Sequence, residues 1–262
     1  MDAPSGEGRT RPRPCILLVE DNEPLRMLLE MTLEAREVEV ASCADVPQAR
    51  AVLARRPIDL LITDLMMPGE SGLALVTELR RQAPGAGYAL PVLALTAGAT
   101  AADRAALAAL GVERIMTKPV PADELLSAVD EVLGLPRHGE DPAPPGEAPL
   151  QARRDDDTAP PDSGPTPAAF AGDHALYLAF LASCRAQFPR DLQDGNLACA
   201  SADLAALRRL AHSLKSVLMS LGLPDAAATA RALEDQCAAG HKAEAAALWP
   251  RLRRVLEDLG AP

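Results

Sequence analysis

Several residue types are scarce in this 262-residue chain, and each shortage excludes a class of protein. Lysine occurs three times among 26 basic residues, and acidic residues outnumber basic ones by 37 to 26, which gives a net charge of −11. Such a charge argues against non-specific electrostatic binding to nucleic acid or to an anionic membrane. No apolar run approaches the roughly 18 residues of a membrane span, so membrane insertion is not expected.

Cysteine is also sparse, and its placement indicates the compartment. The five cysteines are scattered along the chain and form no C-x-x-C pair. An odd, scattered set is typical of reduced thiols, not of a disulfide framework or a zinc site. The first 14 residues mix Arg, Pro and Gly with no apolar segment behind them, so no signal peptide is expected. The sequence therefore predicts a cytoplasmic protein.

Proline is concentrated in one stretch, residues 136–167, where nine of 32 residues are Pro and only Leu150 is a large aliphatic. Such a segment cannot bury enough apolar area to offset the entropy of ordering it, so we expect a flexible linker. Residues 1–14 are expected to be a disordered tail. The chain is thus predicted to hold two domains, residues 15–135 and 168–262, each long enough for its own core.

In the first domain, short apolar runs alternate with helix-length amphipathic segments. Five such β-α repeats predict a parallel sheet covered by helices on both faces. Right-handed crossovers make this a flavodoxin-like, doubly wound α/β fold. The expected strands are 15–19, 38–41, 58–62, 92–95 and 115–116, and the expected helices are 24–36, 46–55, 72–82, 101–110 and 122–133.

Charged and hydroxyl side chains follow these strands at the carboxyl edge of the predicted sheet. They are Glu20, Asp21, Asp64, Thr96 and Lys118. Ligands of open α/β sheets bind at this edge, and clustered carboxylates repel one another unless a cation lies among them. Oxygen ligands of this kind suit Mg²⁺. With the metal and Lys118 to neutralise charge, Asp64 is a candidate nucleophile toward phosphorus, and Thr96 a candidate hydrogen-bond donor to a phosphoryl oxygen.

The motifs around these residues resemble the receiver domain of two-component response regulators. They are ILLVEDN at 16–22, LLITDLMMPGESG at 60–72, LALTAGA at 93–99 and TKPV at 117–120. The resemblance covers about residues 14–135. It implies that Asp64 is the phosphoacceptor, that Glu20 and Asp21 are the acidic pair at Mg²⁺, and that the backbone carbonyl of Met66 is a further metal ligand.

The same resemblance implies three further features. Thr96 corresponds to the switch hydroxyl and Lys118 to the lysine of the family's site, and a cis peptide bond is expected before Pro119. One position departs from the pattern. Ile115 stands where the family usually has an aromatic residue three positions before the lysine. This departure argues against an aromatic rotamer switch.

The second domain is predicted to be helical throughout. Short connections between its helices imply antiparallel neighbours in an all-α four-helix bundle. The expected helices are 173–187, 190–199, 203–221, 225–239 and 243–259, with breaks at Pro189, Ser201, Gly222–Pro224 and Gly240.

One helix of this domain, 203–221, carries a histidine on its polar face. The apolar residues of the helix fall within one arc: Leu207, Leu210, Leu214, Val217, Leu218 and Leu221. His212 lies almost opposite that arc and is expected to project into solvent. Its neighbours on the outer face are Arg208, Lys215, Ser216 and Met219. Lys215 and Arg208 are placed to meet the charge of a phosphohistidine, and Met219 offers a flexible apolar contact to a partner.

The segment AHSLKSVLMSLG at 211–222 resembles the histidine-containing phosphotransfer (Hpt) domain, and Leu233-Glu234 in the next helix agrees with it. The resemblance covers about residues 168–262. It implies His212 as phosphoacceptor and Lys215 as its phosphate neighbour. Ser216 replaces the usual glycine of the family. Arg208, Ser216 and Met219 are therefore predicted to form the docking surface for a partner.

Together these features predict a phosphorelay intermediate. A sensor histidine kinase or hybrid kinase would phosphorylate Asp64, and His212 would exchange the group with its own receiver or with another receiver or Hpt protein. No G-x-x-x-x-G-K-[ST] motif and no glycine-rich ATP lid is found, so the chain is not expected to be an enzyme beyond autodephosphorylation of Asp64.

Other interpretations stay open. The chain also matches a phosphorylation-controlled interaction module with a silent His212, or the carboxyl-terminal fragment of a hybrid sensor kinase. An aspartyl-nucleophile hydrolase is disfavoured, because the D-x-D-x-[TV] motif is absent where Asp64 is followed by LMM. A DNA-binding output is disfavoured because the second domain has 10 acidic and 10 basic residues.

Overall fold

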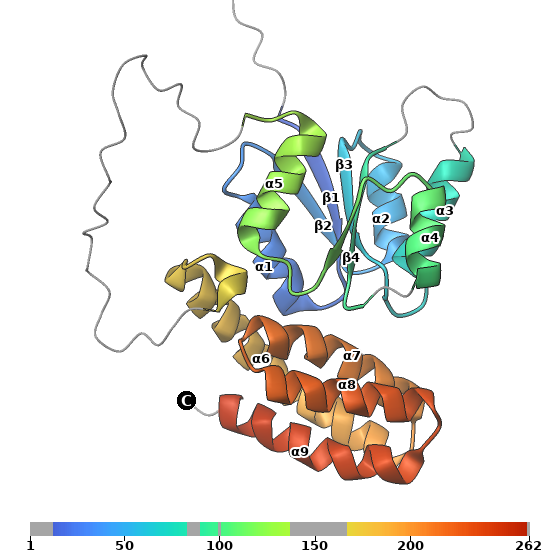
Figure 1. The fold of residues 1–262 in the computed structure, drawn as a ribbon, viewed down its shortest axis with the longest axis vertical. Helices are drawn as coiled ribbons and strands as arrows, with labels where there is room; N and C mark the ends of the chain where they lie inside the picture. Colours follow the sequence, from blue (N-terminus) through green and yellow to red (C-terminus); the bar gives the residue numbers. More distant parts are fainter. Residues whose placement is uncertain (1–12, 83–89, 99–100, 137–166, 261–262) are drawn as a thin grey trace, which may run out of the picture.

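The computed structural model describes residues 13–82, 90–98, 101–136 and 167–260. Residues 13–136 form an α/β part and residues 167–260 a helical part (Figure 1). The predicted tail and linker lie almost wholly outside the described residues. Among the residues that the structure describes, no helix combines the length and the apolar character needed to cross a membrane.

The α/β part is built on a five-stranded sheet in which every paired strand is parallel, with the order β2-β1-β3-β4-β5. Helices α1 and α5 cover one face, and α2, α3 and α4 cover the other (Figure 1). This is the flavodoxin-like order, so the predicted fold class is confirmed. The strands are β1 Cys15–Val19, β2 Glu39–Cys43, β3 Leu60–Asp64, β4 Val92–Thr96 and β5 Arg114–Thr117. The helices are α1 Glu23–Leu33, α2 Val46–Leu53, α3 Gly72–Gln82, α4 Ala101–Ala109 and α5 Ala122–Leu133.

The central strands are apolar on both faces because helices cover both. All five residues of β1, β3 and β4 are buried, including Thr63, Asp64 and Thr96 at the strand ends. Continuous apolar runs of this kind are what a parallel sheet requires. The predicted elements therefore match the observed ones closely, with differences of a few residues at their ends.

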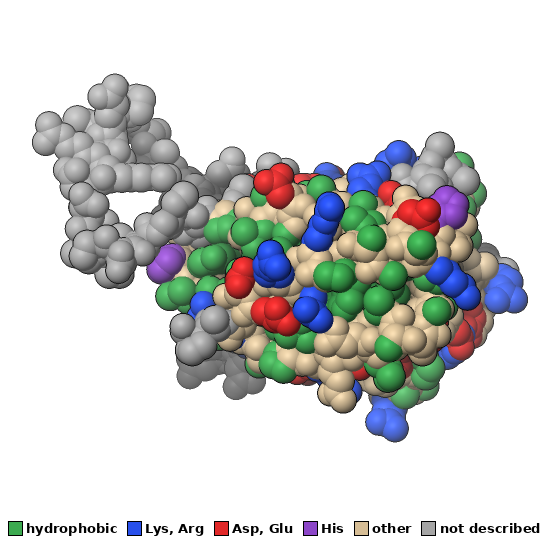
Figure 2. All heavy atoms as spheres, turned by 90° about the horizontal axis from the view of Figure 1, so that it is seen from below, with side chains coloured by type: hydrophobic (Ala, Val, Ile, Leu, Met, Phe, Trp, Pro, Cys, Tyr) green, Lys and Arg blue, Asp and Glu red, His purple; other side chains and the backbone are tan. Residues whose placement is uncertain are grey.

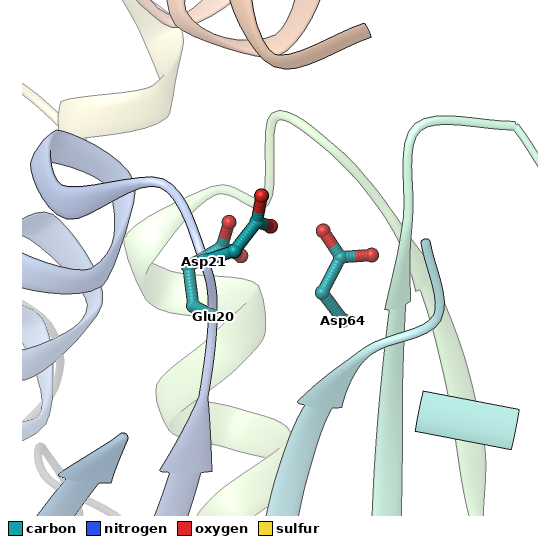
Figure 3. Close-up of side chains that lie close together, drawn as sticks. All are labelled: Glu20, Asp21 and Asp64. Atoms are coloured by element: carbon teal, nitrogen blue, oxygen red, sulfur yellow. The ribbon is translucent and has the colours of Figure 1, made fainter. Parts of the chain in front are cut away.

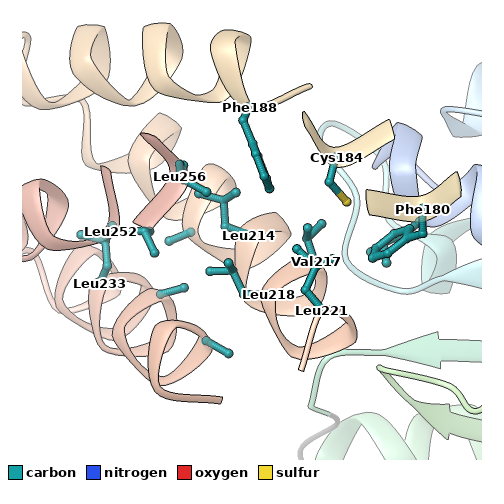
Figure 4. Packing of buried hydrophobic residues seen from close by; sticks show 14 of the residues in the cluster. Phe180, Cys184, Phe188, Leu214, Val217, Leu218, Leu221, Leu233, Leu252 and Leu256 are labelled. Carbon is teal, nitrogen blue, oxygen red and sulfur yellow. The ribbon is translucent and has the colours of Figure 1, made fainter. Parts of the chain in front are cut away.

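The helical part is a bundle of four long helices preceded by a short 3₁₀ turn, η1 Ala168–Phe170. The helices are α6 His174–Ala200, α7 Leu204–Ser220, α8 Pro224–Ala238 and α9 Lys242–Gly260. Helix α6 packs against α7 and α9, and α8 packs against α7 and α9. Figure 4 shows the aromatic and aliphatic side chains that fill the space between them. The predicted four-helix bundle is confirmed.

The predicted helix break at Pro189 is wrong, because α6 runs without interruption from residue 174 to 200. A proline inside a helix costs about 3 kcal/mol through its missing N–H and its ring. Burial of α6 on both sides of Pro189 offsets this cost. Cys184 and Phe188 before it and Ala198 after it are buried in the bundle core, and a buried Phe alone stabilises by roughly 1.5–3 kcal/mol.

Close packing in the bundle also fixes one glycine of α6. A Cβ on Gly195 would lie 2.1 Å from the ring of Trp249 in α9. The Trp249 indole donates a hydrogen bond to the side chain of Asn196, 2.9 Å away. The α6–α9 contact is therefore tight enough that only glycine fits at position 195.

The two parts share one apolar cluster. Leu25 and Leu28 of α1 belong to the same buried cluster as the core of the helical bundle. Figure 1 places α1 beside α6, and the two helices are in contact. The helical part therefore packs against the α/β part through α1.

Candidate functional site

Three carboxylates meet at the carboxyl edge of the sheet (Figure 3). Glu20 and Asp21 follow β1, and Asp64 ends β3, the strand that pairs with β1 in parallel register. Oxygen atoms from all three side chains lie within 4.8 Å of one another. Glu20 and Asp64 are buried, whereas Asp21 is half-buried. The strand pairing thus brings Asp64 beside Glu20 and Asp21, which lie 44 and 43 positions earlier in the sequence.

Lys118, which follows β5, is the cation of this cluster. Its Nζ lies 2.5 Å from Oε2 of Glu20 and 2.5 Å from Oδ2 of Asp64. Burial acts to lower the pKa of Lys118, but the two carboxylates raise it above its ordinary value. Lys118 is therefore an ammonium ion held between two of the three acids.

One ammonium does not balance three carboxylates. Burial raises the pKa of Glu20 to about 7, with Asp64 and Asp21 adding to the rise and Lys118 opposing it. Burial and Asp64 likewise raise the pKa of Asp21. The cluster is therefore short of positive charge, which a divalent cation would supply. Carboxylate oxygens that line a cavity agree with the preferences of Mg²⁺.

The backbone around Asp64 positions its side chain. The backbone N–H of Met66 donates to Oδ1 of Asp64 at 2.9 Å. Thr96, buried at the end of β4, accepts a hydrogen bond from the N–H of Gly98 at 3.1 Å. The peptide bond before Pro119 is cis, as the sequence resemblance implied. Ile115 packs beside Leu65, Ala94 and Leu107, so an aliphatic side chain occupies the position of the family's aromatic residue.

Gly72 allows α3 to begin directly beside the acidic cluster. A Cβ on Gly72 would lie 2.0 Å from the backbone oxygen of Asp64 and 2.6 Å from the hydroxyl of Thr63. Because the nearest atom belongs to the backbone, no side-chain rotation relieves the clash. The closeness of α3 to the end of β3 therefore depends on glycine at this position.

A second cluster lies in the helical part, around His212 of α7. The Nδ1 atom of His212 is 2.8 Å from Oε1 of Glu234 in α8, and Nζ of Lys215 is 2.7 Å from Oε2 of the same carboxylate. Burial favours a raised pKa for Glu234, but the hydrogen bonds from His212 and Lys215 outweigh it and hold the pKa at about 2. Glu234 is therefore ionised at neutral pH.

An ionised Glu234 determines the state of the imidazole. A carboxylate only accepts hydrogen bonds, so Nδ1 of His212 must carry the proton that is shared between them. In a neutral imidazole the lone pair then resides on Nε2. The sequence resemblance had noted Glu234, but spacing alone did not reveal its contact with His212, because the two residues come from different helices.

The expectation that His212 projects freely into solvent is wrong. Its side chain is only 17% exposed. The leucine face of α7 is buried as expected, and His212 points the other way, but the α/β part lies there instead of water. Of the predicted docking residues, Ser216 is buried, whereas Arg208 and Met219 are exposed.

The two clusters open into one cavity of about 250 Å³. Asp64, Lys118 and the acidic pair line it from the α/β part, and His212, Ser216 and Glu234 line it from the helical part. Met66 and Arg208 also belong to its wall. Burial and Asp64 raise the pKa of Asp21, while Lys118 and His212 oppose that rise, so the imidazole lies within electrostatic reach of the acids. The cavity thus joins two sites that belong to different parts of the chain.

The outer face of the helical part has a different character. Figure 2 shows this face with Lys and Arg side chains interspersed among Asp and Glu and with apolar patches between them. The mixture reflects the ten acidic and ten basic residues of positions 168–262. His212 and Glu234 instead line the cavity on the inner side of the helical part, against the α/β part.

Comparisons with known proteins assign both parts. The family model of the response regulator receiver domain matches residues 16–130, and that of the Hpt domain matches residues 179–261. Receiver domains typically bind Mg²⁺ at an acidic pocket, and this chain has such a cluster.

Two curated relatives each match a little under half of this chain. The transcriptional regulatory protein GlrR of Escherichia coli is 35% identical over 118 residues, which are 45% of this chain and 26% of GlrR. The phosphate regulon transcriptional regulatory protein PhoB of Rhizobium meliloti is 37% identical over 120 residues, 46% of this chain and 52% of PhoB. The chain thus spans between a quarter and about half of these relatives.

Two solved structures also cover a little under half of this chain. A response regulator receiver protein from Pseudomonas putida is 30% identical, with a TM-score of 0.43, over 47% of this chain and 99% of that one. A response regulator from Chloroflexus aurantiacus is 29% identical, with a TM-score of 0.42, over 47% of this chain and 98% of that one.

Proposed function

We propose that this chain, which joins a response regulator receiver domain to an Hpt domain, is a phosphorelay intermediate that carries a phosphoryl group on Asp64 and on His212. One observation carries the proposal. The carboxylate of Asp64 and the imidazole of His212 line the same cavity. We assign residues 15–135 to the receiver and 168–262 to the Hpt domain, joined by 136–167.

Asp64 is the proposed acceptor in the receiver. Its carboxylate attacks the phosphorus of a donor and forms an acyl phosphate. Lys118, already 2.5 Å from Asp64, meets the negative charge of the transferred group. Thr96 ends the neighbouring strand and is the proposed hydroxyl partner of a phosphoryl oxygen.

Glu20, Asp21 and Asp64 are the proposed Mg²⁺ ligands, with the backbone carbonyl of Met66 as a further one. When bound, the metal supplies positive charge beside the phosphoryl oxygens. The shortage of positive charge around the three carboxylates supports this assignment, as does their mutual distance of at most 4.8 Å.

His212 is the proposed acceptor in the Hpt domain. Its Nδ1 proton is held by Glu234, so Nε2 offers the lone pair that attacks phosphorus. Lys215 shares the carboxylate of Glu234 and brings a positive charge next to the phosphohistidine. Glu234 is thus a positioning residue for both side chains.

The proposed partners are a sensor histidine kinase or hybrid kinase upstream, and other receiver or Hpt proteins. Phosphotransfer profiling with wild-type, Asp64→Ala and His212→Gln proteins tests the assignment. We expect Asp64→Ala to abolish acceptance from a small-molecule phosphodonor. We expect His212→Gln to keep that step and to lose onward transfer. Asp123→Ala and His241→Gln, which change exposed residues away from the cavity, are the matched controls.

The chemical lability of the label separates this proposal from its alternative, an interaction module in which His212 is silent. Ile115 and Ser216, the two departures from the family patterns, favour that alternative. A relay gives a base-labile label on Asp64 and an acid-labile label on His212. If label never reaches His212 with any receiver, the relay proposal is wrong and the interaction module stands.

A further inference from the structure

Helix α1 has two apolar faces, although a helix at the surface of an isolated domain needs only one. Leu29 and Leu33 point toward the sheet and join its core. Leu25 and Leu28, on another side of the helix, join the core of the helical bundle instead. Both are less than 8% exposed. The second face of α1 is therefore a contact surface for the Hpt domain.

The contact is closely packed. A gap of only about 20 Å³ remains between α1, the segment after β5 and α7. Leu25, Leu28, Pro119 and Ser220 are among the residues that line it. Met31, one helical turn after Leu28, is partly buried against the same cluster. Around Leu25 and Leu28 the two surfaces are therefore complementary, whereas the larger cavity lies beside them at the acidic cluster.

One polar contact sets the register of this interface. The side-chain amide of Asn22 donates a hydrogen bond to the hydroxyl of Ser213 at 2.6 Å. The carbonyl of the same amide caps α1 by accepting from the N–H of Leu25 at 2.9 Å. The cap fixes the orientation of the amide, so its NH₂ group points toward Ser213 of the Hpt domain.

The two partners of this hydrogen bond are direct neighbours of the site residues. Asn22 follows Asp21 of the acidic cluster, and Ser213 follows His212. A bond between Asn22 and Ser213 therefore holds His212 over the cavity that contains Asp64. The contact works as a positioning pair, because it touches neither reacting atom.

We propose that the receiver docks on the Hpt domain of its own chain through Leu25, Leu28 and the Asn22–Ser213 pair, so that Asp64 and His212 exchange the phosphoryl group within one molecule. The inference rests on the proposed function. It adds the partner, which is the same chain, and a consequence: the docked receiver covers His212 and keeps other receivers from it. The 30 residues between positions 136 and 167 span up to about 100 Å when extended, which is ample for this arrangement.

The exchange is balanced without any further reactant. The Nε2 lone pair of neutral His212 forms a bond to phosphorus while the bond between phosphorus and the Asp64 oxygen breaks. Asp64 leaves as a carboxylate with the electron pair. The Nδ1 proton of His212 stays in its hydrogen bond to Glu234 throughout. The reverse reaction returns the group to Asp64 by the same path.

Reaction order tests the proposal on the full chain. Asp64 is loaded with a small-molecule phosphodonor, the donor is removed, and the appearance of phosphohistidine is followed at several protein concentrations. Exchange within the chain gives a rate constant that does not change with concentration. A mixture of loaded His212→Gln chains and Asp64→Ala chains should transfer on the order of a hundredfold more slowly than the dilute wild type.

Variants of α1 test the surface itself. Leu28→Glu should slow exchange within the chain strongly and leave the loading of Asp64 unchanged, because Leu28 faces away from the sheet. Ser213→Ala should slow exchange several-fold. Leu178→Glu, which places the same charge at an exposed leucine of α6, is the control and should have no effect. If Asp64 of the Leu28→Glu protein cannot be loaded, the reaction order of the wild type and the exchange rate of Ser213→Ala test docking within the chain instead.

Two outcomes are distinguishable. A rate that rises linearly with concentration, with the mixture as fast as the wild type, overturns docking within the chain but leaves the relay intact. Complete absence of label on His212, both in these experiments and in phosphotransfer profiling with separate receivers, overturns the proposed function itself.

Discussion

Replacement of Glu234 by Gln separates the structural from the chemical role of the second cluster. The substitution keeps the shape of the side chain but removes the charge that His212 and Lys215 share. The pKa of Glu234 is held at about 2, against an ordinary value of 4.5. A shift of this size corresponds to roughly 3–4 kcal/mol without solvent screening, at 1.36 kcal/mol per pKa unit.

Partial access of solvent reduces this figure, so we expect Glu234→Gln to lose roughly 1–2 kcal/mol of folding free energy at pH 7. The sign follows from linkage. A carboxyl with a lowered folded-state pKa contributes stability above pH 4.5 and loses it as the pH falls toward 2. The difference between wild type and variant should therefore shrink across that window. Urea unfolding at a series of pH values measures it.

The same variant should lose phosphotransfer more than it loses stability. The amide of Gln can present either its oxygen or its NH₂ group to Nδ1 of His212, so both tautomers become populated. Loss of the carboxylate partner of a metal-bound histidine typically costs 10–100-fold, and by analogy we expect a reduction of about this size in transfer to His212. Nitrogen-15 NMR of the imidazole reports the tautomer directly. Asp235→Asn, at the next and exposed position, is the control.

A Glu234→Gln protein that matches the wild type in stability, tautomer and transfer rate would refute this account of the cluster. A protein that loses stability but keeps the tautomer and the rate would restrict Glu234 to a structural role.

Three further predictions follow from single contacts. Gly72→Ala should cost about 1–3 kcal/mol and lower the loading of Asp64, because its Cβ would meet the Asp64 backbone oxygen at 2.0 Å; unfolding and loading measured together check this. Lys118→Arg should lower the loading of Asp64 more than Arg114→Lys does. Nζ of Lys118 lies 2.5 Å from a carboxylate oxygen of both Glu20 and Asp64, and a guanidinium is too large for that space. Equal loading of the two variants would contradict this. Asp191→Asn should raise the free energy of unfolding by roughly 1–3 kcal/mol at pH 7, because burial raises the pKa of Asp191 to about 6 and its ionisation opposes folding. The gain should vanish below pH 3.8, so an equal gain in urea unfolding at both pH values would disprove this cause.

The sheet and its site were predictable because their signals are local. Each strand is a short apolar run, and the residues directly after the strands meet at one edge of any parallel sheet. Glu20, Asp64 and Lys118 therefore converge as expected. The break at Pro189 was predicted wrongly because local propensity was weighed without the burial of Cys184 and Phe188, which only the assembled bundle reveals.

The environment of His212 was not predictable from its own helix. Helical periodicity correctly placed it opposite the leucines of α7, but periodicity does not tell whether water or another domain covers that face. The covering residues lie about 190 positions away, as in the contact of Asn22 with Ser213. A signal was present in α1, where Leu25 and Leu28 form an apolar face that the sheet does not need.

The scarcity of lysine acquires a physical meaning from these contacts. Where the chain needs a fixed ion pair it uses arginine, as in the two-pronged contacts of Arg36 with Asp130 and of Arg50 with Glu70. Two of its three lysines instead contact the proposed acceptor clusters, Lys118 at Asp64 and Lys215 at Glu234. A planar guanidinium fixes the carboxylate it binds, whereas an ammonium is compact and rotates freely among its partners. The proposed transfer requires a phosphoryl group to be held at Asp64 and then released to His212, and an ammonium suits both steps better than a guanidinium. The use of lysine at these two sites, in a chain that otherwise uses arginine, therefore agrees with the chemistry proposed for the cavity.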